Sequence, residues 1–472
     1  MQVILGVGGI LFLTSLVALY WGISRRPPPG PSVVLFTMDT VRKDHLGCYG
    51  YDKNTSPHLD KLAKEGVIFD GAYTAAVHSA TSHASMMTGL PPGKHGLLDN
   101  TFALRSDVET AAEAAQSAGA RTAAFISYGL VGEHVGLRRG FDDFELNTVP
   151  NHIEEAEVPL DVAMKTFHRA AEWIKGNPER FFIWIHAQNA HYDWRPASPY
   201  AERFAAAPTS SGEEEPFDEE VLGCVFTLNN AIRKEKRRFS EGEAAPLVAR
   251  YDGEIAIVDD GLRLIQDAIA ESGAADHTTF IVLADHGTTL FDRQGQDYVD
   301  HAEIFYEEVL NIPLVVSGPA VPSDLGGKRI NGYVETLSVA RTIERVLGDG
   351  FGHRGKMPED LFALAAGDRP TLPDEFPERI WMYDAPFRAI REGRFKLMIQ
   401  LDQGERLYDL ATDPDEKNDV RAAHPEVFQR LKKRLRERRA KLVKQLEKST
   451  RPQMSAEVKA MLQQGGYLPR SR

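Results

Sequence analysis

Short runs of apolar residues, rich in β-branched side chains, recur along the chain and predict the strands of a buried sheet. The clearest runs are SVVLFTM (32–38), TAAFIS (122–127), RFFIWIHA (180–187), TTFIVLA (278–284) and IPLVVSG (312–318). These runs are continuous rather than alternating, which is typical of parallel strands that are covered on both faces.

Segments with the apolar spacing of helices separate these runs. They are SPHLDKLAKEGV (56–67), DVETAAEAAQSAG (107–119), PLDVAMKTFHRAAEWIKG (159–176) and ARYDGEIAIVDDGLRLIQDAIAESG (249–273). Strands that alternate with helices predict an α/β fold of the doubly wound kind, with a mostly parallel central sheet flanked by helices.

The pattern changes near residue 375, where alternating strands replace the continuous runs. RAIREGRFKLMIQLDQGERLYDL (388–410) predicts antiparallel hairpin strands, and HPEVFQRLKKRLRERRAKLVKQLEK (424–448) predicts a long basic helix with one apolar stripe. We therefore expect a catalytic domain over 32–372 and a small antiparallel C-terminal subdomain over 373–472. The helix either packs on the domain or contacts anionic lipid.

The N-terminal residues predict a membrane anchor. Residues 3–23 form an apolar run of about the length that crosses a bilayer, with Tyr20 and Trp21 near its end. We expect a single-pass transmembrane anchor over 1–23 and a proline-rich spacer over 24–31, with a cleaved signal peptide as the alternative. Arg25 and Arg26 favour a cytoplasmic location for the domain that follows.

Composition narrows the function further. The 472-residue chain has a net charge of −13, which argues against a general nucleic-acid binder. Its two cysteines, Cys48 and Cys224, are too few for a disulfide framework or a cysteine-rich zinc site. We expect two buried free thiols, and a single disulfide stays open.

Acidic and imidazole side chains gather where the predicted strands end, which is where open α/β sheets bind ligands. Asp39, Asp285 with His286, and His301 stand near strand ends, as do His186, Asn189 and His191. A lone Asp after a strand can simply cap a helix. Together, Asp39, Asp285 and His286 offer two carboxylates and one imidazole, which suit Zn²⁺, Mn²⁺ or Ca²⁺.

The segment VHSATSHASMMTGLPPGKHG (77–96) offers a nucleophile beside these groups. Ser79 stands just before a predicted helix over 81–87, where unpaired amide groups attract an anionic ester. A nearby metal would lower the pKa of the Ser79 hydroxyl, and His83 and His95 could bind the ester oxygens or protonate a leaving group. The alternative is an ordinary capped helix.

Several blocks in one order carry a resemblance to a known family. They are VVLFTMDTVRKDHLGCYGYDKNTSPHLDKLAKEGVIFDGAYT (33–74), SATSHASMMTG (79–89), VLADHG (282–287), HAEIFYEEVLNIPLVVSGP (301–319) and the region RAIREGRFKLM to LYDLATDPDEKNDV (388–420). Over nearly everything after the spacer, the chain resembles the sulfatases of the alkaline phosphatase superfamily.

The resemblance implies a role for each matching residue. Ser79 falls on the nucleophile position, and Asp39, Asp285 and His286 fall on metal-ligand positions, with Ser79 itself also facing the metal. The remaining matches are His83 in place of the motif arginine, His95, His191 and His301 at substrate-contacting positions, and Thr40 where many sulfatases have a second aspartate.

Two departures from the family pattern matter for the chemistry. Sulfatases convert the motif Cys or Ser to formylglycine, and the modifying enzymes look for Pro or Ala followed by Arg. This chain has Thr81 and His83 at those positions, so we expect Ser79 to be unmodified and to attack directly. A metal site of carboxylate, hydroxyl, Asp and His also resembles that of phosphoethanolamine transferases and of phosphonate or phosphate ester hydrolases.

The preferred function is therefore a metal-dependent hydrolase of sulfate monoesters. The alternatives are a phosphoester or phosphonate hydrolase, a phosphoethanolamine-type transferase, and a non-catalytic binding domain. We expect a small-molecule, glycan or lipid ester as substrate, no nucleic-acid partner, and membrane attachment through the N-terminal helix. Because the family is mostly exported, we place the catalytic domain on the periplasmic or extracellular side.

Overall fold

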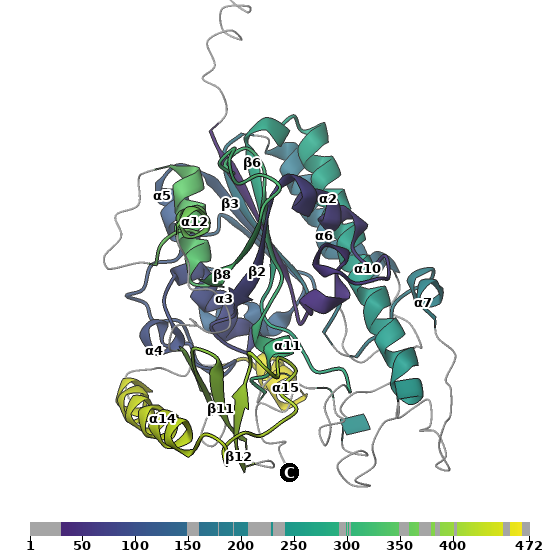
Figure 1. The fold of residues 1–472 in the computed structure, drawn as a ribbon. Helices are drawn as coiled ribbons and strands as arrows, with labels where there is room; N and C mark the ends of the chain where they lie inside the picture. Colours follow the sequence, from purple (N-terminus) through teal and green to yellow (C-terminus); the bar gives the residue numbers. More distant parts are fainter. Residues whose placement is uncertain are drawn as a thin grey trace, which may run out of the picture. The chain divides into compact units, whose positions relative to one another are not determined.

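Eight strands form the central sheet of the computed structural model (Figure 1). The structure describes residues 30–148, 160–177, 179–191, 193–205, 228–229, 241–291, 299, 301, 304–348, 358–367, 379–382, 388–400, 404–446 and 454–464. The predicted anchor over 1–23, most of the predicted spacer and Cys224 lie outside these residues. Cys48 is a free, partly buried thiol, as expected.

The sheet is mostly parallel, and its order is β4-β3-β5-β1-β6-β7-β2-β8. Only β7 runs antiparallel to its neighbours, β6 and β2. The bounds are β1 Ser32–Met38, β2 Val67–Tyr73, β3 Arg121–Ile126, β4 Asp143–Leu146, β5 Phe181–Ala187, β6 Thr278–Ala284, β7 Leu314–Ser317 and β8 Arg329–Glu335. Every residue of β1, β5 and β6 is buried, as the continuous apolar runs predict for strands covered on both faces.

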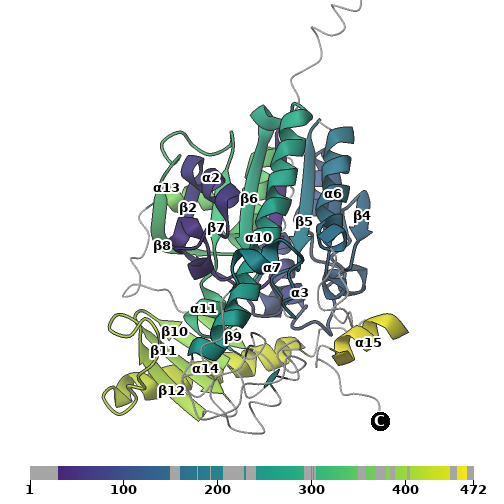
Figure 2. The same cartoon turned by 90° about the vertical axis from the view of Figure 1, so that its right-hand side faces the viewer.

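Helices cover both faces of this sheet (Figures 1 and 2). One layer holds α2 (Pro57–Glu65), α6 (Leu160–Gly176) and α10 (Glu241–Glu271), and the other holds α3 (Ser79–Thr88), α5 (Ala111–Ser117) and α12 (Ser338–Leu347). The shorter helices are α4 (Pro92–His95), α7 (Tyr200–Arg203), α11 (Glu307–Leu310), α13 (Leu361–Ala366) and α15 (Ala456–Gln464). The predicted α/β fold is confirmed.

The C-terminal region forms the expected antiparallel sheet. Its order is β12-β11-β10-β9, with bounds β9 Arg379–Met382, β10 Arg388–Glu392, β11 Phe395–Gln400 and β12 Gly404–Asp409. Helix α14 (Pro425–Leu446) packs an apolar stripe on it, made of Val427, Leu431 and Leu435. The stripe therefore covers protein, as the first of the two interpretations of this helix predicts. The domain boundary at residue 372 stays a prediction.

The predictions of a transmembrane helix and of a single-pass membrane location are wrong. Among the helices that the structure describes, none combines the length and the apolar composition needed to cross a membrane. This finding contradicts the predicted transmembrane helix and the single-pass location, because an apolar run in the sequence does not by itself establish a spanning helix.

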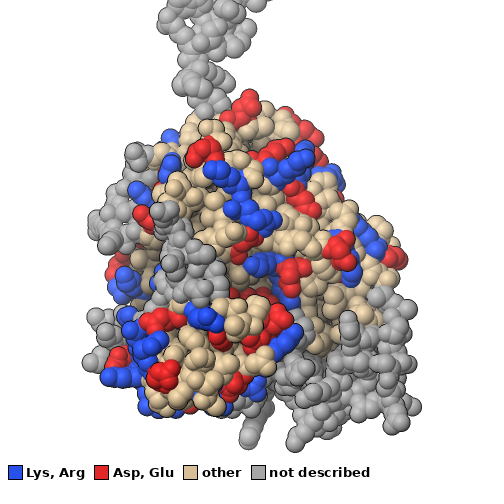
Figure 3. All heavy atoms as spheres, viewed as in Figure 1, with Lys and Arg blue, Asp and Glu red and all other residues tan. Residues whose placement is uncertain are grey.

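The surface carries both signs of charge. On the face drawn in Figure 3, Lys and Arg are interspersed with Asp and Glu. Several exposed pairs are in contact, such as Arg121 with Asp143 at 3.0 Å. Exposed ion pairs of this kind contribute at most about 1 kcal/mol each to the free energy of unfolding.

Candidate active site

The carboxyl ends of two neighbouring strands bring the predicted acidic groups together. Strands β1 and β6 are parallel and in register, with Met38 opposite Ala284. The next residue on each strand is therefore Asp39 on one and Asp285 on the other. Both side chains are fully buried, so each carboxylate needs a partner that offsets its lost hydration.

Ser79 reaches the same point from helix α3, where it is the first helical residue. Its Oγ lies 3.4 Å from Asp39 Oδ2 and 3.3 Å from His286 Nε2. His286 Nε2 in turn lies 3.4 Å from Asp285 Oδ2 and 4.0 Å from Asp39 Oδ1. The structure thus places the predicted nucleophile and the predicted metal ligands Asp39, Asp285 and His286 in one buried cluster.

The ring orientation of His286 suits a metal ligand. Its Nδ1 lies 3.1 Å from the Gly287 carbonyl oxygen, and a carbonyl oxygen only accepts, so Nδ1 carries the proton. Burial lowers the pKa of His286 well below its usual value, which keeps the ring neutral. Nε2 therefore presents a lone pair toward Ser79 and the two carboxylates, as a coordinating imidazole requires.

The two carboxylates also fit a cation. The backbone N–H groups of Thr40 and His286 donate to Asp285 Oδ1, at 3.2 and 2.8 Å. Asp285 Oδ2 and Asp39 Oδ1 are buried and accept no hydrogen bond from the described part of the chain. Burial and the nearby charge of Asp285 raise the pKa of Asp39, and burial raises that of Asp285. A bound cation would remove this cost.

The geometry therefore supports a metal site. The ligand atoms of Asp39, Asp285 and His286 lie within 4.8 Å of one another, so a divalent cation could bind to this buried group. Thr40 contributes differently from the aspartate that many sulfatases have there: its Oγ1 donates to the Ala190 carbonyl oxygen at 2.8 Å. Its role is to orient Asp285 through its backbone N–H.

His301 and His191 border the cluster. The His301 ring stacks on His286 with centroids 4.3 Å apart, and its Nδ1 donates to the Val77 carbonyl oxygen at 3.0 Å. Its Nε2 then carries a lone pair that faces His191 Nε2 at 3.4 Å. The proton of this contact is therefore on His191 Nε2. His191 is separated from the metal-ligand candidate His286 by the ring of His301.

His83 lies one turn along α3 from Ser79. Its Nδ1 lies 2.7 Å from the Ser79 carbonyl oxygen and 3.8 Å from Asp285 Oδ2, and its Nε2 lies 3.0 Å from Thr37 Oγ1. Burial lowers the pKa of His83, so the ring is neutral. His83 therefore touches the cluster without the permanent positive charge of the arginine that sulfatases have there.

His95 has a different environment. Its Nε2 lies 3.0 Å from Ser85 Oγ, and its Nδ1 accepts from the Leu97 N–H at 3.2 Å. Burial lowers its pKa to about 3. Both ring nitrogens thus have protein partners that join α3 to the loop after α4, and a substrate contact for His95 stays a prediction.

Two further buried side chains lie next to the residues of the cluster. Asn100 is fully buried, its Oδ1 accepts from the Ala80 N–H at 3.3 Å, and its Nδ2 has no hydrogen-bond partner within the described ranges. His186 on β5 is also fully buried, with its Nε2 3.6 Å from Asp39 Oδ2. Nothing in the sequence singles out Asn100, while His186 is visible as a strand-end histidine without an assigned role.

Comparisons with known proteins show the family of the chain. The family model described as Sulfatase matches residues 31–348. The chain belongs to the sulfatase family. A Δ4,5-hexuronate-2-O-sulfatase of Bacteroides thetaiotaomicron is 23% identical over 427 residues, which cover 84% of this chain and 86% of the relative.

Solved structures share the fold. A phosphonate monoester hydrolase of Agrobacterium radiobacter superposes with a TM-score of 0.68 at 19% identity, over 87% of this chain and 96% of that one. A structure described as bound to its substrate D-glucosamine-2-N,6-O-disulfate superposes with a TM-score of 0.67 at 17% identity, over 88% and 98%. The predictions of a sulfatase-family chain, an alkaline-phosphatase-like fold and a sulfatase-like hydrolase are confirmed.

Proposed function

We propose that this chain hydrolyses sulfate monoesters with Ser79 as the nucleophile. The observation that carries this proposal is the position of the Ser79 Oγ at the start of α3, within 3.4 Å of both Asp39 and His286. Membership of the sulfatase family supports the reaction class. Site roles are our inference from geometry.

The residues suit an in-line displacement at sulfur. Ser79 Oγ loses its proton to Asp39 Oδ2 and bonds to sulfur, while the bond from sulfur to the ester oxygen breaks. The departing alcohol takes a proton from a protonated His191 ring, and the neutral ring then takes a proton from the water that attacks the sulfated Ser79. Sulfate leaves, and the serine recovers its proton.

Asp39, Asp285, His286 and Ser79 would hold a divalent cation. Bound there, it would polarise the ester oxygen and lower the pKa of the Ser79 hydroxyl. Zn²⁺, Mn²⁺ and Ca²⁺ are the candidates, and the imidazole ligand favours Zn²⁺ or Mn²⁺ because Ca²⁺ prefers oxygen ligands.

Amide donors near Ser79 would stabilise the negative charge on the sulfuryl oxygens. Helix α3 begins at Ser79 with no side-chain cap at His78. The Ala80 N–H bonds to Asn100 Oδ1 and the Ser82 N–H bonds to the His78 carbonyl oxygen, so the N–H groups of Ser79 and Thr81 are the candidate donors of this turn. The buried Asn100 Nδ2 adds a donor beside them. This arrangement resembles an oxyanion hole in function.

A sulfated glycan is the substrate class that we favour. The hexuronate-2-O-sulfatase relative and the structure bound to glucosamine disulfate act on sulfated sugars by their descriptions. We carry this over as a proposal. The phosphonate monoester hydrolase neighbour keeps phosphoric and phosphonic esters as the alternative.

Mass spectrometry of the Ser79 peptide, combined with an ester screen, tests the proposal. We expect intact serine and faster turnover of 4-nitrophenyl sulfate than of 4-nitrophenyl phosphate or phenylphosphonate. A peptide lighter by two hydrogen atoms would reveal formylglycine and overturn direct attack by serine. Faster phosphate or phosphonate turnover would favour the alternative hydrolase, and a product that requires an added acceptor would favour a transferase.

A further inference from the structure

Strand register places a second set of ligand atoms on the face of the sheet that α3 covers. Thr37 on β1 lies opposite His186 on β5, and paired residues of parallel strands point to the same face. Trp184, two residues before His186, donates from its Nε1 to Thr37 Oγ1 at 3.0 Å. His186 thus extends from this face beside Asp39.

His186 is a fully buried polar side chain that lacks hydrogen-bond partners on both ring nitrogens among the described residues. Its Nε2 lies 3.6 Å from Asp39 Oδ2, which is too far for a hydrogen bond. Buried polar groups are normally satisfied, so these nitrogens are available to a ligand.

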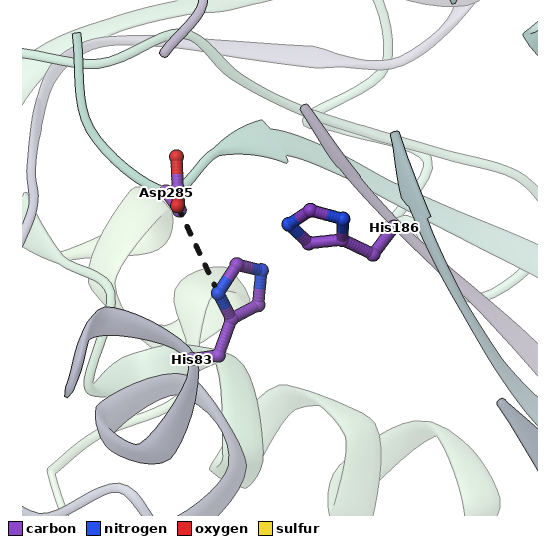
Figure 4. Close-up of side chains that lie close together, drawn as sticks. All are labelled: His83, His186 and Asp285. Carbon is purple, nitrogen blue, oxygen red and sulfur yellow. Dashed lines mark ion pairs between the residues drawn. The ribbon is translucent and has the colours of Figure 1, made fainter. Parts of the chain in front are cut away.

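Figure 4 shows that His83, His186 and Asp285 converge from a helix, a strand and a strand end. One ligand atom from each lies within 4.8 Å of the others. His83 Nδ1 is 3.8 Å from Asp285 Oδ2. Two imidazoles and a carboxylate are a ligand set that suits Zn²⁺.

We propose that a second divalent cation binds between His83, His186 and Asp285, so that Asp285 bridges two cations. This inference rests on the metal centre of the proposed function, which uses Asp39, Asp285, His286 and Ser79. The second cation would supply positive charge next to Ser79.

Thr37 allows His83 to serve as a ligand. With Nδ1 protonated, His83 donates to the Ser79 carbonyl oxygen and its Nε2 accepts from Thr37 Oγ1. For Nδ1 to bind a cation, it must give up its proton and its hydrogen bond to the Ser79 carbonyl oxygen, the ring must turn Nδ1 away from that oxygen, and Nε2 must carry the proton instead. Thr37 Oγ1 can then accept from His83 and from Trp184 while it donates to the Ile185 carbonyl oxygen, 3.4 Å away.

The buried Lys and Arg side chains that the structure describes do not balance the charge of the Asp39 and Asp285 carboxylates. The buried Lys and Arg side chains of the described ranges are Arg42, Arg391 and Lys396. Arg42 pairs with Asp44, and the other two pair with Glu307. Among the buried side chains that the structure describes, imidazoles are therefore the remaining positive partners for the two carboxylates of the cluster.

Metal stoichiometry of the purified, untagged full chain tests this inference. The protein is stripped with a chelator, reloaded with Zn²⁺ alone, freed of excess metal by gel filtration and measured by plasma mass spectrometry. We expect two zinc ions per chain. We expect one in His186→Gln and one in His286→Gln, and two in the control His191→Gln, whose ring borders the cluster on the His301 side.

Each outcome decides the matter. One zinc ion in the unmodified chain, or two in a folded His186→Gln, would overturn the second site and leave the first intact. No bound zinc would overturn both the second site and the metal centre of the proposed function. Thermal melting shows whether His186→Gln is folded. If it is not, the number of zinc ions bound by the unmodified chain alone tests the second site.

Discussion

At the scale of single residues, the site depends on which atom of each side chain is free. Backbone N–H groups occupy Asp285 Oδ1, and the Gly287 carbonyl oxygen fixes the proton of His286 on Nδ1. The remaining atoms, Asp285 Oδ2 and His286 Nε2, are the ones that face Ser79. Asn100 is a similar case: its Oδ1 accepts a hydrogen bond from the Ala80 N–H, and its Nδ2 has no hydrogen-bond partner among the described residues.

Asn100→Ala should lower kcat for aryl sulfate about 10²–10³-fold, because one charge-stabilising donor is lost. Asn100→Asp keeps an oxygen for the Ala80 N–H but removes the donor, so we expect a comparable loss. Stopped-flow or plate kinetics with a melting curve for each variant provide the measurement. A kcat within threefold of the unmodified protein in Asn100→Asp would rule out this role.

The sequence predicts Ser79, Asp39, Asp285 and His286 as site residues because they stand at strand and helix ends in recognisable blocks, and the structure brings these four together. It could not identify Asn100, whose contact with Ala80 depends on the path of the loop after α4. Nor could the sequence assign a role to His186. The face of the sheet to which this ring points, next to Asp39, follows from the pairing register of β1 and β5.

At the scale of elements, continuous apolar runs predicted the central strands accurately. The runs over 32–38 and 278–284 coincide with β1 and β6. Strand β8, RINGYVE, was not predicted, because it begins with partly exposed residues and contains a glycine. An edge strand of this kind lacks the apolar run that burial on both faces requires.

Helix α10 contains a buried acid that links stability to pH. Glu254 is nearly fully buried, accepts from the Arg195 N–H at 3.0 Å, and burial raises its pKa to about 8. The unfolded chain releases this proton at lower pH, so the folded state holds the extra proton from about pH 4.5 to about pH 8, and stability falls as pH rises through that range.

Glu254→Gln should remove this dependence. Linkage gives Glu254 a contribution of about 2 kcal/mol to the loss of unfolding free energy between pH 6 and pH 8, and we expect the loss in the variant to be smaller by about this amount. Urea titrations at several pH values measure it. Glu271→Gln, exposed on the same helix, is the control that should keep the original slope; an unchanged slope in Glu254→Gln would contradict the account.

At the scale of the whole molecule, a buried ionic cluster joins the C-terminal sheet to the helix α11. Lys396 on β11 is fully buried, and its Nζ lies 2.9 Å from Glu307 Oε1 and 2.7 Å from Glu416 Oε1. Arg391 on β10 also contacts Glu307. Helix α11 directly precedes β7 of the central sheet, so this cluster secures the C-terminal sheet against the catalytic domain.

Lys396→Met should destabilise the protein by about 3–5 kcal/mol, because it leaves two buried carboxylates with fewer partners. Lys417→Met removes an exposed pair with Asp415 at 2.8 Å and should cost at most about 1 kcal/mol. Chemical denaturation of both variants makes the comparison. Equal effects would show that the buried cluster does not secure the C-terminal sheet.

The rate of aryl sulfate hydrolysis by Ser79→Ala tests the central claim most directly. The variant removes only the Oγ that contacts Asp39 and His286, so its fold and the three other metal ligands remain. With metal-loaded protein, we predict that kcat falls by at least about 10³-fold while melting stays near that of the unmodified chain. Turnover within tenfold of the unmodified protein would contradict the assignment of Ser79 as the nucleophile.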